Sequence, residues 1–331
     1  MLLGAACVAP QPSKDGWVWR VGDVGEPRSL RGLAPVSAAC CFVGGSGGTL
    51  QRTTDGGATW QDVAPAGAGA CDFRDVEVVG DRVVLAMVAG SPARLYRSED
   101  RGDSWCMVHE DPRPGAFFDA VAFDGDHGVV FGDAIGGRFV LLETADAGRT
   151  WRDVPAPALP APVPGEAAFA ASGTCLVAGP IGFALVTGGG ACRYVEVRPG
   201  ISCTTRSLPM QGPGASQGAF SVAWRGARGV CVGGDYQDPA RRDGTAAITL
   251  DGGATWDRSD AGGYRSGVAW VSDRAVVAVG SHGASWSVDG GRTFSPFGSE
   301  PFHSVARAPD GAVWACGAGG RVGRLVRRAA P

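Results

Sequence analysis

Lysine, long apolar runs and clusters of basic residues are nearly missing from this chain. Lys14 is the only lysine among 331 residues, and the 30 basic residues are matched by 33 acidic ones and spread along the sequence. Nucleic-acid-binding proteins gather Lys and Arg into a stripe or patch, so we expect no nucleic-acid partner. No stretch approaches the roughly 18 apolar residues that a membrane-spanning helix needs, so no transmembrane segment is expected.

Sequence signals for helices, metal sites and nucleotide cofactors are also missing. The 54 Gly and 22 Pro interrupt nearly every window, and apolar residues alternate instead of recurring at helical spacing. There is no C-x-x-C pair, and the acidic loop with Asp235, Asp238 and Asp243 is better interpreted as solvated than as a calcium site. No G-x-G-x-x-G lies between a strand and a helix. We therefore expect no metal and no cofactor.

The N-terminus resembles the end of a bacterial lipoprotein signal. Residues 1–7 read Met-Leu-Leu-Gly-Ala-Ala-Cys and precede a linker with Pro, Ser and Lys. The apolar run is shorter than the roughly 7 residues of a signal core and has no basic region, so an ordinary N-terminal tail is the alternative. We interpret residues 1–14 as a signal remnant or linker. Cys7 is then a candidate lipid anchor, and the expected location is exported, in the periplasm or outer envelope.

One short motif, [S/T]-x-D-x-G-x-[S/T]-[W/F], organises the chain. It occurs five times, at residues 53–60, 98–105, 144–151, 249–256 and 287–294. Its Asp can accept backbone N–H groups across a tight turn, its Gly can take positive φ, and its aromatic can pack back on the strands. We assign this structural role to Asp55, Asp100, Asp146, Asp251, Asp289, Trp60, Trp105, Trp151, Trp256 and Phe294. The long gap between the third and fourth copies predicts one worn copy, at residues 186–192.

A period of about 40–50 residues built from short strands is typical of a β-propeller. Seven innermost strands can be aligned, starting at residues 30–33, 73–76, 118–121, 168–171, 220–222, 264–267 and 302–305. The last blade lacks an outer strand, which residues 17–21 can supply, removing the exposed edge. The sequence predicts an all-β, seven-bladed propeller over residues 15–331, in one domain and monomeric.

The motif is that of the Asp-box, or BNR repeat, and the chain resembles the photosystem II stability/assembly-factor-like propellers. It is most similar to bacterial, non-photosynthetic members that are often labelled oxidoreductases, a label that these residues do not support. The resemblance is most specific outside the repeats, at residues 117–120, 127–133, 136–141, 165–171, 232–236 and 264–266. It implies a non-catalytic binding or assembly role.

The starts of the innermost strands surround the channel mouth, where propellers commonly bind ligands. The candidate binding residues are those that follow the aromatic or leucine at the start of these strands: Arg31, Arg74, Asp119, Ser221, Arg265 and His303. Glu166, just before the fourth strand, is added to this set. Arginine forks suit an acidic group on a protein partner or a small ligand. The alternative is that the arginines pair with Asp75, Asp119 and Glu166 around a wet channel.

A sialidase-like glycoside hydrolase is the alternative function. It would use an arginine clamp for a carboxylate, a Tyr–Glu nucleophile pair and an acid, here Arg31, Arg74, Arg265, Tyr264, Glu166 and Asp119. The Arg-Ile-Pro motif of sialidases is missing, and their propellers have six blades. Tyr264 and Arg265 are also neighbours on one strand, so both cannot face the channel without a bulge. We therefore predict a binding protein without catalytic residues.

Four cysteines leave disulfide pairing open. Cys71 with Cys106, or Cys192 with Cys203, could be bridged in an oxidising compartment. Other cysteines lie in apolar runs before glycine, where a free thiol serves as a small apolar group.

Overall fold

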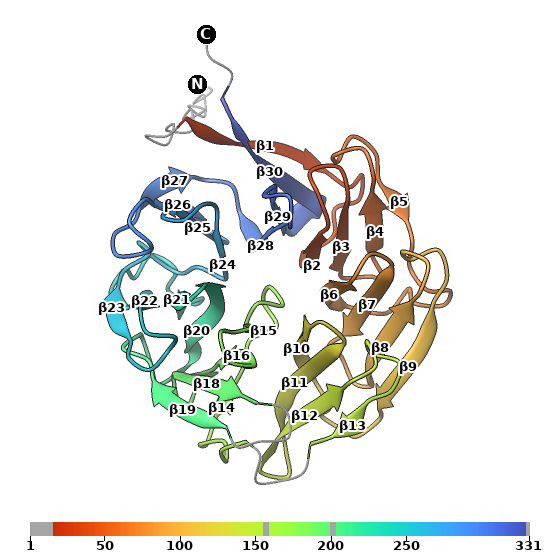
Figure 1. Ribbon diagram of the computed structural model, residues 1–331, viewed down its shortest axis with the longest axis horizontal. Helices are drawn as coiled ribbons and strands as arrows, with labels where there is room; N and C mark the ends of the chain where they lie inside the picture. The colour runs from red at the N-terminus through yellow and green to blue at the C-terminus, as the bar shows by residue number, and fades with distance from the viewer. Residues whose placement is uncertain (1–15, 155–158, 199–202, 329–331) are drawn as a thin grey trace, which may run out of the picture.

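The computed structural model describes residues 16–154, 159–198 and 203–328, and it arranges them as seven antiparallel sheets around a central axis (Figure 1). Blade 1 consists of β2(Leu30–Pro35), β3(Cys41–Gly45), β4(Leu50–Thr53) and β5(Gln61–Asp62). Blade 2 consists of β6(Phe73–Val79), β7(Val83–Val88), β8(Ala93–Ser98) and β9(Cys106–Asp111). Blade 3 consists of β10(Phe118–Asp124), β11(His127–Ile135), β12(Arg138–Thr144) and β13(Arg152–Asp153). Blade 4 is β15(Leu176–Ala178), β16(Phe183–Val186), β18(Arg193–Val197), β19(Thr204–Ser207).

Blade 5 is β20(Gly214–Arg225), β21(Arg228–Asp235), β22(Ala246–Thr249), β23(Asp257–Ser259), and its sheet is extended by β14(Glu166–Ala167) and β17(Gly188–Gly189). Blades 6 and 7 are β24(Gly267–Trp270), β25(Val276–Gly280), β26(Gly283–Ser287), β27(Ser295–Gly298); and β28(Phe302–Arg307), β29(Val313–Gly317), β30(Arg321–Arg327), β1(Trp17–Asp23). The predicted all-β, seven-bladed propeller is confirmed. In the part of the chain that is described, no helix is long and apolar enough to span a bilayer.

The two ends of the chain close the ring in blade 7. Strand β1 pairs antiparallel with β30 along its whole length, from Trp17 opposite Arg327 to Asp23 opposite Arg321. The indole of Trp19 packs between blades 6 and 7, with its ring centroid 6.1 Å from that of Phe297 and 5.1 Å from that of Phe302. The predicted closure by an N-terminal strand is thus confirmed. Residues 1–15, with Cys7, lie outside the described residues.

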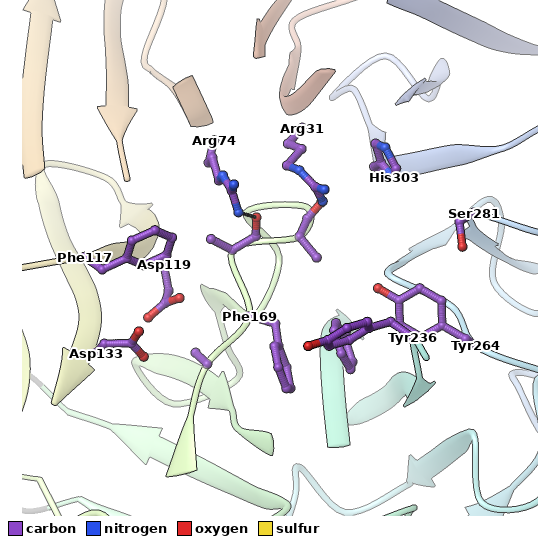
Figure 2. Close-up of a pocket in the computed structure, with 14 residues that line it drawn as sticks. Arg31, Arg74, Phe117, Asp119, Asp133, Phe169, Tyr236, Tyr264, Ser281 and His303 are labelled. Atoms are coloured by element: carbon purple, nitrogen blue, oxygen red, sulfur yellow. Dashed lines mark hydrogen bonds between the residues drawn. The ribbon is translucent and has the colours of Figure 1, made fainter. Parts of the chain in front are cut away.

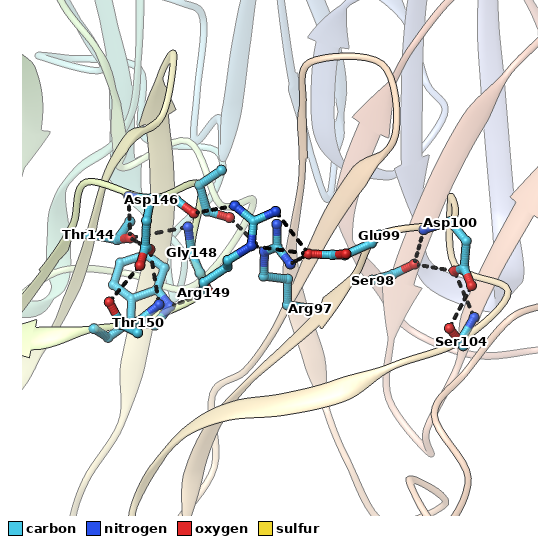
Figure 3. Close-up of polar contacts among 12 residues, drawn as sticks. Arg97, Ser98, Glu99, Asp100, Ser104, Thr144, Asp146, Gly148, Arg149 and Thr150 are labelled. Carbon is cyan, nitrogen blue, oxygen red and sulfur yellow. Dashed lines mark hydrogen bonds and ion pairs between the residues drawn. The ribbon is translucent and has the colours of Figure 1, made fainter.

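The five repeated turns join the third and fourth strands of their blades and share one hydrogen-bond pattern. In the turn of blade 3, Asp146 Oδ1 accepts the Thr150 N–H at 3.0 Å, and Oδ2 accepts the Thr150 hydroxyl at 2.7 Å. The Gly148 N–H donates to Thr144 Oγ1 at 3.1 Å, with Gly148 at φ +77°. Figure 3 shows this turn beside the equivalent one at Asp100. These hydrogen bonds lower the pKa of Asp146 to about 2, with the Thr150 hydroxyl as the largest cause.

The same turns connect neighbouring blades. Trp105 of the blade 2 turn donates its indole N–H to the Val63 carbonyl of blade 1 at 2.6 Å. Between blades 2 and 3, Arg97 donates to the Ala147 carbonyl at 2.8 Å and to Glu99 at 2.6 Å, and Arg149 lies 3.1 Å from the same glutamate (Figure 3). The turns therefore lie at the outer seams between blades, away from the central channel.

Replacing Asp146 by Asn should lower stability in a pH-dependent manner. Because the folded-state pKa is depressed from 3.8 to about 2, the carboxylate contributes stability that is fully present above about pH 4 and is lost as the pH falls toward 2. We expect the variant to melt roughly 2 °C below the wild type at pH 7. Thermal unfolding followed from pH 7 to pH 2 should show this gap closing. A gap of constant size would contradict the assignment to carboxylate hydrogen bonds.

Blade 4 departs from the sequence prediction in two ways. Its innermost strand is β15, whereas residues 168–171, which we had expected to form that strand, form an irregular segment before it. Residues 186–192 connect β16 to β18, which are the second and third strands, so the proposed worn repeat is not at the position of the other five. The nine described cysteines, which include both candidate disulfide pairs, are free.

Candidate functional site

A β-bulge in the innermost strand recurs in five blades. The ladder register shifts between Leu30 and Gly32, Phe73 and Asp75, Phe118 and Ala120, Ala219 and Ser221, and Phe302 and Ser304. The residues skipped in the ladder are Arg31, Arg74, Asp119, Phe220 and His303. A bulge places two residues opposite one and re-aims the side chain of the extra residue. The same backbone irregularity therefore turns one side chain per blade toward the channel mouth.

These five side chains meet in a cavity of about 410 Å³. Its other lining residues are Phe117, Asp133, Ala168, Phe169, Ala170, Ala171, Tyr236, Tyr264 and Ser281. Figure 2 shows two arginines and a histidine on one side, two acids with Phe117 on another, and a group of aromatic rings on the third. The volume lies within the range of small-molecule and side-chain binding pockets.

Residues 168–174, here called the channel segment, form the floor of the cavity. Its carbonyl oxygens accept hydrogen bonds from four blades. Arg31 of blade 1 donates to Ala171 O at 3.2 Å, and Arg74 of blade 2 donates to Ala170 O at 3.4 Å. The Val222 N–H of blade 5 donates to Thr174 O at 3.0 Å, and the Ser304 hydroxyl of blade 7 donates to Ser172 O at 3.3 Å. Partners in four blades mean that the segment crosses the propeller axis. It thus supports the two arginines from below.

The basic side of the cavity carries positive charge that is only partly neutralised. Arg74 forms an ion pair with Asp72 at 2.7 Å, whereas Arg31 has no carboxylate within 4 Å among the described residues. Burial, and next the charge of Arg74, lower the pKa of Arg31. Burial, followed by the charges of Arg31 and Arg74, lowers the pKa of His303 to about 4, so this imidazole is neutral at pH 7. The mouth therefore presents two guanidinium groups and one neutral imidazole.

The aromatic side consists of four rings in contact. Phe169 of the channel segment stacks on Phe220, with centroids 3.9 Å apart and planes 4° from parallel. Tyr236 meets both rings edge-on at 6.2 Å, and Tyr264 meets Phe220 edge-on at 4.9 Å. Tyr236 is 46% exposed, so it lies at the entrance, whereas burial raises the pKa of Tyr264 above its usual range. This wall suits an apolar or aromatic part of a ligand.

The acidic side is formed by Asp119 and Asp133. Burial is the largest cause that raises the pKa of each, and the charge of Asp133 raises that of Asp119 further. For Asp133, burial raises the pKa to about 6. Two such neighbouring carboxyl groups titrate as a pair and hold a proton more tightly than ordinary carboxyls.

Comparison with solved structures establishes the fold. The chain is similar in fold to YCF48. A structure described as YCF48 bound to D1 peptide aligns with a TM-score of 0.67 and 16% identity, covering 96% of this chain and 99% of the other. YCF48 from Cyanidioschyzon merolae aligns with a TM-score of 0.65 and 18% identity, covering 93% and 98%. This is the kind of propeller that the sequence resembles.

A propeller that carries an enzyme's name also aligns over most of the chain. A streptogramin B lyase structure has a TM-score of 0.61 and 11% identity, covering 95% of this chain and 99% of the other. No family model matches the chain, and no curated protein sequence matches it. Because identities this low show the fold alone, the function must be argued from the cavity itself.

The structure brings together Arg31, Arg74, Asp119 and His303 of the predicted binding set, with Tyr264 beside them. Ser221 and Arg265 do not line the cavity. In blade 5 the bulged residue is Phe220, so Ser221 is buried behind it, where its hydroxyl meets Thr174 at 2.6 Å and accepts the Val268 N–H at 3.1 Å.

In blade 6 it is Tyr264 that faces the cavity, and its neighbour Arg265 points away. The Arg265 guanidinium is buried and donates to Ser285 Oγ at 2.7 Å and to the Tyr264 carbonyl at 2.7 Å. Burial lowers its pKa to about 10. The arginine clamp of the alternative hydrolase is thus reduced to Arg31 and Arg74.

Glu166 also lies outside the cavity lining. Its fully buried carboxylate accepts the Thr187 hydroxyl at 2.7 Å and Arg193 Nε at 2.7 Å, and it forms a further contact with Arg193 Nη2. A carboxylate satisfied in this way has a structural role and is not available to Tyr264. The Tyr264–Glu166 nucleophile pair of the hydrolase alternative is therefore not assembled.

Several cavity residues were not in the predicted set: Phe117, Asp133, Phe169, Phe220, Tyr236 and Ser281. A signal for most of them was present. All but Phe220 and Ser281 fall in the segments outside the repeats where the family resemblance is most specific. The segments that contain these four residues converge on the cavity, whereas the repeated turns lie at the periphery.

Proposed function

We propose that this chain is a non-catalytic binding or assembly-factor-type propeller that holds an acidic group of a protein partner in the cavity at the channel mouth. The observation that carries the proposal is the placement of Arg31 and Arg74 side by side above the channel segment, next to an aromatic wall. Two guanidinium groups offer several donors to a carboxylate in a partly desolvated setting, where charge-assisted hydrogen bonds are strong. A propeller of similar fold, YCF48, was solved with a bound peptide, which supports a protein partner.

The cell envelope is the proposed place of action. It rests on the resemblance of residues 1–7 to a lipoprotein signal, with Cys7 as the anchored residue. The hydrolase alternative has less support, because Arg265 and Glu166 have structural partners of their own.

Carboxylate binding and its loss in Arg31→Gln test the proposal. We expect N-acetylphenylalanine to bind the wild-type protein in a calorimetric titration and its neutral amide to bind far more weakly. Because Arg31 donates charge-assisted hydrogen bonds and has no internal carboxylate to satisfy, Arg31→Gln should weaken binding by roughly 10–100-fold. His303 is neutral between pH 6 and 8, but burial raises the pKa of Asp133 in the same cavity to about 6. The affinity for a carboxylate should therefore fall as Asp133 loses its proton above about pH 6.

Arg138→Gln is the matched control, because Arg138 is an exposed arginine of β12 outside the cavity lining. It should bind as the wild type does. Equal binding of the acid and the amide, or unchanged affinity in Arg31→Gln, would contradict the proposal.

A further inference from the structure

The acidic side of the cavity is built by the same backbone device as the basic side. Asp119 is the bulged residue of β10, and Asp133 is the bulged residue of the adjoining strand β11, where the register with β12 shifts between Gly132 and Ala134. Both side chains line the cavity, and Figure 2 shows their carboxyl groups facing one another. Two consecutive strands of blade 3 thus depart from the ladder to place two acids together.

These acids have oxygen atoms with no partner inside the described part of the protein. Asp119 is only 1% exposed, yet its Oδ2 is buried without a hydrogen-bond partner, and the same holds for Asp133 Oδ1. Nearly all buried polar atoms in folded proteins are paired. Both acids line the cavity of about 410 Å³, so their buried, unpaired oxygens point to donors supplied by a ligand.

The neighbouring cation does not satisfy the pair. Arg74 directs its Nε to Asp72 at 2.7 Å and its Nη1 to the Ala170 carbonyl at 3.4 Å, and its Cζ lies 5.6 Å from the centre of the Phe117 ring. The raised pKa values of Asp119 and Asp133 are those expected of buried carboxyls that lack a cation of their own.

We propose that Asp119 and Asp133 bind a guanidinium or ammonium group of the same ligand whose carboxylate lies against Arg31 and Arg74. The cavity would then select a ligand, or a chain-terminal residue of a partner, that carries a basic group as well as a carboxylate. Organic cations offer several N–H donors, as two facing carboxyls require. This inference rests on the proposed function, because it assigns a ligand group to the acidic side of the same cavity.

Two ligands of nearly the same shape, N-acetylarginine and N-acetylcitrulline, test it, because citrulline has a neutral urea group in place of the guanidinium. Citrulline keeps the shape of arginine and loses its positive charge. We expect the wild-type protein to bind N-acetylarginine on the order of tenfold more tightly in a calorimetric titration at pH 7.5. In Asp133→Asn the ratio of the two affinities should fall to about one, because the negative charge that favours the cationic ligand is removed.

Asp153→Asn is the control, since Asp153 is an exposed acid of the same blade, on β13, outside the cavity lining. It should keep the wild-type ratio. Asp119→Asn provides a second test if Asp133→Asn does not fold, which thermal unfolding will show.

The possible failures are distinguishable. If both ligands bind equally and Arg31→Gln weakens both, the carboxylate site stands and the cation site is overturned. If neither binds, the cation site is overturned, and the carboxylate site is overturned as well only if N-acetylphenylalanine also fails to bind. If CaCl2 alone strengthens N-acetylcitrulline binding, and Asp133→Asn removes that effect, the pair holds a metal ion and the organic-cation assignment is wrong.

Discussion

Trp19→Ala is expected to lower the free energy of unfolding by about 2 kcal/mol, below the range for truncating a fully buried aromatic residue, because Trp19 is only partly buried against the core. Strand β1 has a ladder partner on one side only, β30. Its other ring contacts come from Trp17, whose centroid lies 6.4 Å from that of Trp286 in blade 6, and from Trp19, which packs on Phe297 of blade 6 and Phe302 of blade 7. Removing the indole leaves a cavity at the seam where the ring closes. Equilibrium denaturation in urea, with and without the substitution, measures the effect.

Val21→Ala is the control for Trp19→Ala. Val21 lies on the same strand but is 42% exposed, so its truncation should change stability by less than about 0.5 kcal/mol. A large effect at Trp19 and a small one at Val21 would show that the seam depends on inter-blade packing. Similar effects would show instead that the β1–β30 ladder alone holds the closure.

The blade count and the closure were predictable because they depend on features that repeat. Each blade needs short alternating strands and a tight turn, and these leave a pattern at a period of about 40–50 residues. The missing outer strand of blade 7 followed from the same count. Most of the fold could therefore be predicted from local sequence features that repeat in nearly every blade.

The cavity was harder to predict because it depends on where a bulge falls. In blades 1, 2, 3 and 7 the residue after a leucine or phenylalanine is the bulged one. In blade 5 the residue before the bulge is Ala219, not an aromatic residue or a leucine, and Phe220 is itself the bulged residue. Aligning that phenylalanine with the others shifted the prediction by one residue, to Ser221. A shift of one residue moves a side chain to the opposite face of a strand.

The channel segment was missed for a different reason. Residues 168–171 have the apolar composition of a strand, but they pass across the axis and make tertiary hydrogen bonds to other blades. Such partners, distant in sequence, leave no periodic signal. Glu166 was misplaced with this segment, since its true partner, Arg193, is 27 residues away.

Gly173→Ala should have a larger effect than any substitution at the surface of a blade. Gly173 has φ +73°, and a Cβ at this position would lie 2.2 Å from Asp75 Oδ1. Asp75 cannot move easily, because its buried carboxyl accepts the Val76 N–H at 2.9 Å and the Val121 N–H of the next blade at 2.8 Å. Burial raises the pKa of this carboxyl to about 7. We expect a loss of roughly 3–5 kcal/mol from strain and steric overlap combined.

Gly67→Ala separates the two contributions to that loss. Gly67 has φ +80°, and no atom lies within 4 Å of the position that a Cβ would occupy. Its substitution therefore introduces backbone strain without steric overlap. Its cost should be about 1–2 kcal/mol, measured by the same urea denaturation. If Gly173→Ala costs no more than Gly67→Ala, the channel segment does not pack tightly on Asp75. If it costs several-fold more and also weakens N-acetylphenylalanine binding, then the segment that closes the channel is also the support that holds Arg31 and Arg74 in place. Stability at the axis and binding at the mouth would then depend on the same few hydrogen bonds.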